Sequence, residues 1–77
     1  MPETDQKSFE ILARTVHEVA GVPTAAIRRE SLLVEDLGLD SLALVEVMYV
    51  LEERLNIAVP EESLADVKTV MDLLDLF

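Results

Sequence analysis

An all-α fold is the class that this sequence predicts, as a small four-helix bundle with a long loop between the first two helices and a short third helix. Apolar residues recur at spacings of three and four along segments long enough to form helices. Strand-like alternation occurs only at residues 56–59, which is too short for a sheet. Because 77 residues can build one core and little else, we expect a single domain over residues 1–77.

The first helix is expected over residues 4–20, where the apolar side chains form one stripe of Phe9, Leu12, Ala13, Val16, Val19 and Ala20. Gly21 and Pro23 end this helix. A long connection then leads to Asp40, with a short helical turn expected at residues 23–27. Spaced apolar residues of this connection are expected to fold back onto the helices, namely Val22, Ile27, Leu33 and Leu37.

The second helix is expected over residues 41–55, which contain neither glycine nor proline. One apolar stripe is expected to lie in the core, formed by Leu44, Val47, Met48, Leu51 and Leu55. A second apolar stripe, Leu42, Val45 and Tyr49, lies beside the acids Glu46, Glu52 and Glu53. An apolar strip flanked by acids is typical of a surface that docks briefly in an apolar groove rimmed by lysine and arginine.

Short helices are expected at the end of the chain. Pro60 suits the first position of a third helix that runs to Ala65, and Glu61 and Glu62 interact favourably with the dipole at its start. Thr69 is expected to cap a final helix, whose apolar residues Val70, Leu73, Leu74 and Phe77 close the bundle.

The charge of the chain restricts its partners. Sixteen acids against 6 bases give a net charge of −10, which repels nucleic acid and anionic membranes and favours partners with basic patches. No apolar run approaches the roughly 20 residues of a membrane span. The chain also starts without the basic and apolar regions of a signal peptide. We therefore expect a cytoplasmic monomer.

Few groups are available for metal binding or thiol chemistry. The chain has no cysteine and one histidine, which excludes disulfides, thiolate metal sites and a cysteine nucleophile. The acids Glu35, Asp36 and Asp40 lack the glycine and glutamate spacing of a calcium loop. No metal site is expected, and any thiol chemistry has to come from an added group.

Ser41 is the candidate for a covalent modification. It follows a turn in which Gly38 permits a positive φ and Asp40 suits a helix N-cap. Ser41 then falls in the first helical turn, where a phosphate ester would lie beside unpaired backbone N–H groups and the positive end of the helix dipole. Taken alone, a serine at this position is better explained as part of an ordinary helix start than as a modification site.

The residues around Ser41 resemble the acyl carrier protein family, whose signature is Asp-Ser-Leu at the start of the second helix. The likeness spans essentially the whole chain, through residues 34–38, Glu46, residues 51–53 and residues 59–62. It implies a 4′-phosphopantetheine arm that a phosphopantetheinyl transferase attaches from coenzyme A to Ser41, with acyl groups held as thioesters. It also implies that Asp40 helps to place the transferase's magnesium ion and coenzyme A, and that residues 1–77 form one acyl carrier domain.

The resemblance implies that the second helix recognises the partner enzymes, which are the transferase and acyl-loading, ketosynthase or acyltransferase enzymes with basic docking patches. The expected partner-binding residues are Leu42, Ala43, Leu44, Val45, Glu46, Tyr49, Glu52 and Glu53. Many fatty-acid carriers have an acid and then a small polar residue where this chain has Ala43 and Leu44, and a methionine in place of Tyr49. This difference favours a polyketide or other specialised pathway over fatty-acid synthesis.

The residues support other functions less well than the carrier function. A nucleophilic Ser41 needs a base and an oxyanion site, but His17 is on another helix and no Gly-x-Ser-x-Gly motif is present, so we expect a non-catalytic carrier. A peptidyl or aminoacyl carrier and a purely protein-binding bundle remain alternatives. If the second and third helices part, the interior could shelter an acyl chain among Val47, Leu51, Ile57, Leu64 and Val67.

Overall fold

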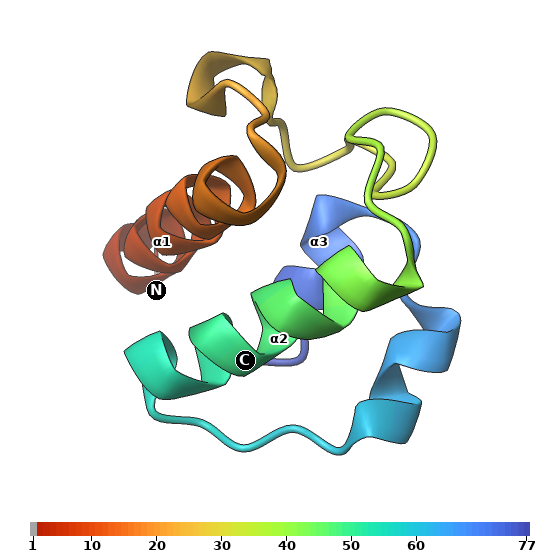
Figure 1. Cartoon of the computed structure of the whole chain (residues 1–77). Helices are drawn as coiled ribbons and strands as arrows, with labels where there is room; N and C mark the ends of the chain where they lie inside the picture. Colours follow the sequence, from red (N-terminus) through yellow and green to blue (C-terminus); the bar gives the residue numbers. More distant parts are fainter. Residues whose placement is uncertain (1) are drawn as a thin grey trace.

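The computed structural model describes the backbone of residues 2–77 and the side chains of residues 6–77. Its elements are helical: α1 (Pro2–Ala20), the 3-10 helix η1 (Thr24–Ala26), α2 (Ser41–Leu55), the 3-10 helix η2 (Glu61–Asp66) and α3 (Val70–Leu74). Figure 1 shows the long connection from α1 to α2 passing over one end of the molecule. Extended pairing among the described residues is limited to one isolated bridge, between Leu32 and Thr69. The all-α class and the long loop are thus confirmed.

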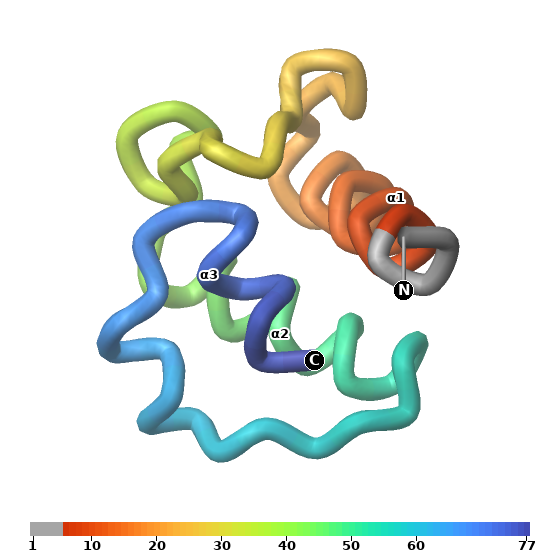
Figure 2. The backbone as a smooth tube through the Cα atoms, turned by 180° about the vertical axis from the view of Figure 1, so that it is seen from behind, coloured from red at the N-terminus to blue at the C-terminus, as the bar shows by residue number. Residues whose placement is uncertain are grey.

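Helix α1 contacts η1, α2 and α3, and Figure 2 shows the course of the backbone that joins these elements. The fully buried side chains of the core include Leu12 and Val16 from α1 and Leu51 from α2. Ala20, which we expected on the same apolar stripe of α1, is exposed. It is the last residue of α1, and the chain turns away at Gly21, whose φ is +76°.

Thr15 is a core residue that the apolar pattern of α1 did not indicate, because it is polar and yet fully buried. Its hydroxyl donates a hydrogen bond to the Ile11 carbonyl at 2.8 Å and accepts one from Arg54 Nη1 at 3.0 Å. Arg54 Nη2 also pairs with Glu18 Oε1 at 2.5 Å. One guanidinium thus joins the end of α2 to two side chains of α1.

The long connection is part of the core. Ile27, Leu33 and Leu37 are buried as expected, and Val22 is half-buried. Backbone hydrogen bonds also tie the connection to the start of α3, from Leu33 N to Lys68 O at 2.9 Å and from residue 70 N to residue 31 O at 3.0 Å. The segment that leads to α2 is therefore held against α3.

The two C-terminal helices lie close to the positions that the sequence predicts. The expected third helix is the 3-10 helix η2, and Pro60 lies just before it with ψ at 137°, so the helix begins one residue later than predicted. Thr69 caps α3 as predicted. Its hydroxyl accepts from Asp72 N at 3.1 Å, and the Asp72 carboxylate accepts from Thr69 N at 3.1 Å, which is a complete capping box.

Asp72 gives the fold a pH dependence. Its carboxylate accepts hydrogen bonds from the backbone N–H groups of Lys68 and Thr69, and these bonds hold the pKa of Asp72 below its ordinary value. The stabilisation is therefore present above the unfolded-state pKa of about 3.9 and is lost as the pH falls through the lower pKa of the folded state.

We expect Asp72→Asn to lower the free energy of unfolding at pH 7. The effect should become smaller as the pH falls below the unfolded-state pKa of about 3.9 and through the lower pKa of the folded state. Urea unfolding at several pH values measures this, with Asp75→Asn, an exposed acid at the end of α3, as the control. An Asp72→Asn effect that is the same at every pH would contradict this role.

Candidate functional site

The turn before α2 contains Gly38, and buried residues on both sides of this glycine hold the turn in place. Gly38 has a φ of +70°, as predicted, and its N–H donates to the Val34 carbonyl at 3.0 Å. Leu37 and Leu39, its two neighbours, are buried in the core. Leu39 was not among the core residues predicted from the sequence, although it is fully buried. Two buried leucines thus anchor the turn and set the position at which α2 begins.

Asp40 caps α2, as predicted. Its carboxylate accepts a hydrogen bond from Ala43 N at 2.8 Å, and its carbonyl accepts one from Leu44 N at 2.9 Å. In the part of the chain that the structure describes, no protein acceptor takes the N–H groups of Ser41 and Leu42. Two free donors at the positive end of a 15-residue helix suit a bound phosphate.

Ser41 differs from the other serines in its exposure. It is the first residue of α2 and is exposed. Ser31 is buried, and its hydroxyl oxygen accepts from Arg28 N at 3.0 Å, whereas Ser8 and Ser63 are half-buried in helices. Among the four serines, the hydroxyl of Ser41 is the one that a partner enzyme reaches most readily. Its surroundings fit a covalently attached phosphodiester.

His17 is exposed in the last turn of α1, and its Nδ1 lies 2.9 Å from the Val22 carbonyl oxygen. Its hydrogen-bond partner is therefore the chain just beyond α1 rather than Ser41. Residues 6–77 also contain no group of three or more histidine, aspartate or glutamate side chains placed to hold a metal ion. The histidine gives no support for Ser41 as an enzyme nucleophile.

The second apolar stripe of α2 lies on the surface. Leu42 is 70% exposed and Tyr49 is 56% exposed. Val45 between them is half-buried, and Glu46 and Glu53 are exposed beside them. We call these five residues the α2 face, an apolar strip with acids at its edge.

The three remaining expected partner-binding residues, which lie outside the α2 face, are half-buried. Ala43 and Leu44 are half-buried and pack against the core, which confirms the prediction that Leu44 belongs to the core stripe of α2 and leaves both residues less surface for a partner. Glu52 is half-buried, and its carboxylate accepts a hydrogen bond from Val59 N at 2.6 Å. Among the acids at the end of α2, Glu53 faces solvent while Glu52 holds the chain that follows the helix.

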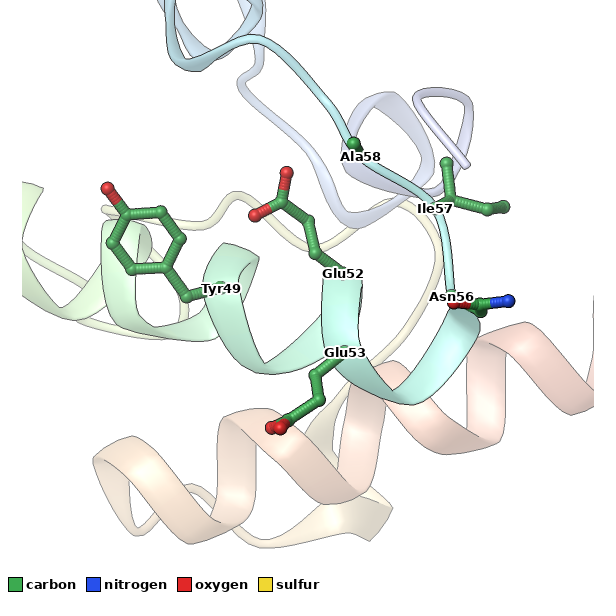
Figure 3. Close-up of a pocket in the computed structure, with 6 residues that line it drawn as sticks. All are labelled: Tyr49, Glu52, Glu53, Asn56, Ile57 and Ala58. Carbon is green, nitrogen blue, oxygen red and sulfur yellow. The ribbon is translucent and has the colours of Figure 1, made fainter.

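A surface depression of about 580 Å³ lies at this end of α2 (Figure 3). It is lined by Tyr49, Glu52, Glu53, Asn56, Ile57 and Ala58.

Of the residues expected to shelter an acyl chain, Val47 and Leu51 are buried and Leu64 and Val67 are half-buried. Ile57 is instead 41% exposed, and it directly follows Asn56, which ends α2 in a left-handed conformation.

Comparison with known proteins identifies a family model and several relatives that match most of this chain. A family model described as "Phosphopantetheine attachment site" matches residues 10–77. The chain is 33% identical over 75 residues to "Acyl carrier protein" of Thermobifida fusca, which covers 97% of this chain and 95% of that protein. It is 39% identical over 64 residues to "Acyl carrier protein" of Acidothermus cellulolyticus, covering 83% and 76%.

A third relative has a more specific name. "Meromycolate extension acyl carrier protein" of Mycolicibacterium smegmatis is 33% identical to this chain over 73 residues, covering 95% of this chain and 74% of that protein.

No helix in the described structure is long and apolar enough to span a membrane.

Proposed function

This chain belongs to the acyl carrier protein family, and on that premise we propose that Ser41 bears the arm and that residues 1–77 act as a single, non-catalytic carrier domain. The family carries a covalently attached 4′-phosphopantetheine, and its members interact with phosphopantetheinyl transferases and biosynthetic enzymes. The observation that supports Ser41 is its exposed hydroxyl at the N-terminus of α2, beside two free N–H groups.

The chain's own residues position the arm. Asp40 fixes the first turn of α2 through its bond to Ala43 N, which keeps Ser41 in one place and orientation. The free N–H groups of Ser41 and Leu42 and the helix dipole stabilise the charge of a phosphodiester. When bound, the arm supplies a terminal thiol, whose thioesters activate acyl groups because a thiolate leaves readily. Attachment to one carrier also gives each acyl group a high effective concentration at a docked enzyme.

The α2 face is the proposed docking surface. Leu42 is exposed next to Ser41, and Tyr49 is exposed farther along α2. Glu46 and Glu53 add negative charge at the edge of this apolar strip. A groove rimmed by lysine and arginine would complement this arrangement. The net charge of −10 would also steer such partners toward the carrier and make docking sensitive to salt.

The cargo is an acyl chain made by fatty-acid or polyketide enzymes. The names of the relatives favour fatty-acyl cargo over an amino acid, since they are acyl carriers and one is named for meromycolate extension. The exposed Tyr49 on the docking face supports a specialised partner, such as a polyketide enzyme. We therefore keep polyketide synthesis as the second candidate.

Mass spectrometry tests the carrier function. We expect incubation with coenzyme A and a broad-specificity phosphopantetheinyl transferase to add one phosphopantetheine to the chain. With acetyl- or malonyl-coenzyme A in place of coenzyme A, the added mass should include the acyl group, and hydroxylamine should then release it as expected for a thioester. A chain that gains no mass with a transferase active on a control carrier would contradict the proposal.

A further inference from the structure

In the described structure, the chain between α2 and η2 is hydrogen-bonded to the preceding helix through one residue, Glu52. We call residues 56–60 the strap. Among the described residues, the hydrogen bonds that join the strap to the preceding structure all end on Glu52. The Glu52 carbonyl accepts from Asn56 N and from Ile57 N at 3.1 Å, and its carboxylate accepts from Val59 N at 2.6 Å.

The two kinds of bond differ in strength and in location. The carbonyl bonds complete the C-terminal cap of α2 and hold only the first two residues of the strap. The carboxylate bond reaches farther along, to Val59, whose side chain is 9% exposed. It is a charge-assisted bond to a largely buried residue, which makes it the stronger single contact. Figure 3 shows the Glu52 carboxylate turned toward the strap and the Glu53 carboxylate on the other side of the helix.

The opposite side of α2 is fastened differently. There the end of α2 is joined to α1 by Arg54, which bonds both Thr15 and Glu18, and by the buried side chains of both helices. Movement of the strap breaks none of these contacts. The strap also begins at a left-handed residue, Asn56, and ends at a proline with extended ψ, so it is bounded by two distinct changes of chain direction.

We propose that the Glu52 carboxylate is a latch that holds the strap closed against the end of α2. When the carboxylate releases Val59 N–H, the strap opens as a local event and Val59 leaves the core, while α1 and α2 stay joined. The value of such a latch for the carrier rests on the proposed function. Opening gives an acyl chain on the arm a route toward Val47 and Leu51, and a partner cation that binds Glu52 competes with Val59 N–H for the same carboxylate.

Amide hydrogen exchange measured by NMR on the full-length chain tests the latch. In Glu52→Gln we expect exchange at Val59 N–H to accelerate about tenfold or more, because the charge-assisted bond is lost. The Val59 amide proton resonance should also shift upfield as its hydrogen bond weakens. Exchange at Leu51 and Val70, in the core of α2 and at the start of α3, should be unchanged.

The matched control is Glu53→Gln, which removes the same charge from the neighbouring residue and should leave Val59 N–H unchanged. Equal acceleration in both variants would mean a general charge effect, and equal acceleration at Leu51 would mean global destabilisation. Either result would overturn the latch, as would unchanged exchange and an unchanged Val59 resonance in Glu52→Gln. Because the unmodified chain is used, these outcomes do not depend on whether Ser41 carries the arm.

Discussion

Ser41→Ala is expected to abolish attachment of phosphopantetheine while leaving the fold intact. The hydroxyl oxygen is the atom that would form the phosphodiester, so its removal leaves no acceptor for the transferred group. The fold should not change, because the side chain is exposed and the cap of α2 is made by Asp40 and not by Ser41. The mass gain seen for the unmutated chain with coenzyme A and a transferase should be absent, and the urea unfolding curve should stay nearly the same.

The control for this result is Ser63→Ala. Ser63 is half-buried in η2, and its replacement also removes one hydroxyl from the chain. It should gain one phosphopantetheine at a rate close to that of the original sequence. If Ser41→Ala were still modified, the attachment site would lie elsewhere, and the role given to the N-terminus of α2 would be wrong.

The sequence predicted the parts of this fold that depend on neighbouring residues. The bounds of α2, the cap at Asp40, the positive φ at Gly38 and the cap at Thr69 all appear as expected. Each rests on the chemistry of a few adjacent residues, such as a carboxylate that reaches a backbone N–H three positions along the chain. The exposure of Ser41 follows from the same local geometry.

Contacts that depend on tertiary structure could not be predicted. Thr15 and Arg54 are 39 positions apart, and nothing near either residue shows that the threonine is buried beneath a guanidinium. Glu52 and Glu53 are adjacent acids with the same local pattern, yet one holds Val59 and the other faces solvent. Helical periodicity predicts the face of the helix on which a side chain lies. The segment that this side chain contacts depends instead on the tertiary fold.

Leu51→Ala is expected to cost about 2–5 kcal/mol of stability, because Leu51 is fully buried in the core and its truncation leaves a cavity. A domain of 77 residues is typically stable by about 4–12 kcal/mol, so this one change removes a large share of the total. Urea unfolding followed by circular dichroism measures the loss. A change below about 0.5 kcal/mol would show that Leu51 is not the core residue that its burial indicates.

Leu42→Ala makes the same chemical change nine positions earlier in α2, at a side chain that is 70% exposed. Its effect on stability should stay within about 0.5 kcal/mol. If the α2 face docks partners, however, this variant should lower kcat/KM for modification by the transferase about tenfold, because the partner no longer buries the leucine. Leu51→Ala should lower this rate only to the extent that it unfolds the chain. A Leu42→Ala variant that is fully stable and is modified at the original rate would show that the transferase does not use this part of the helix.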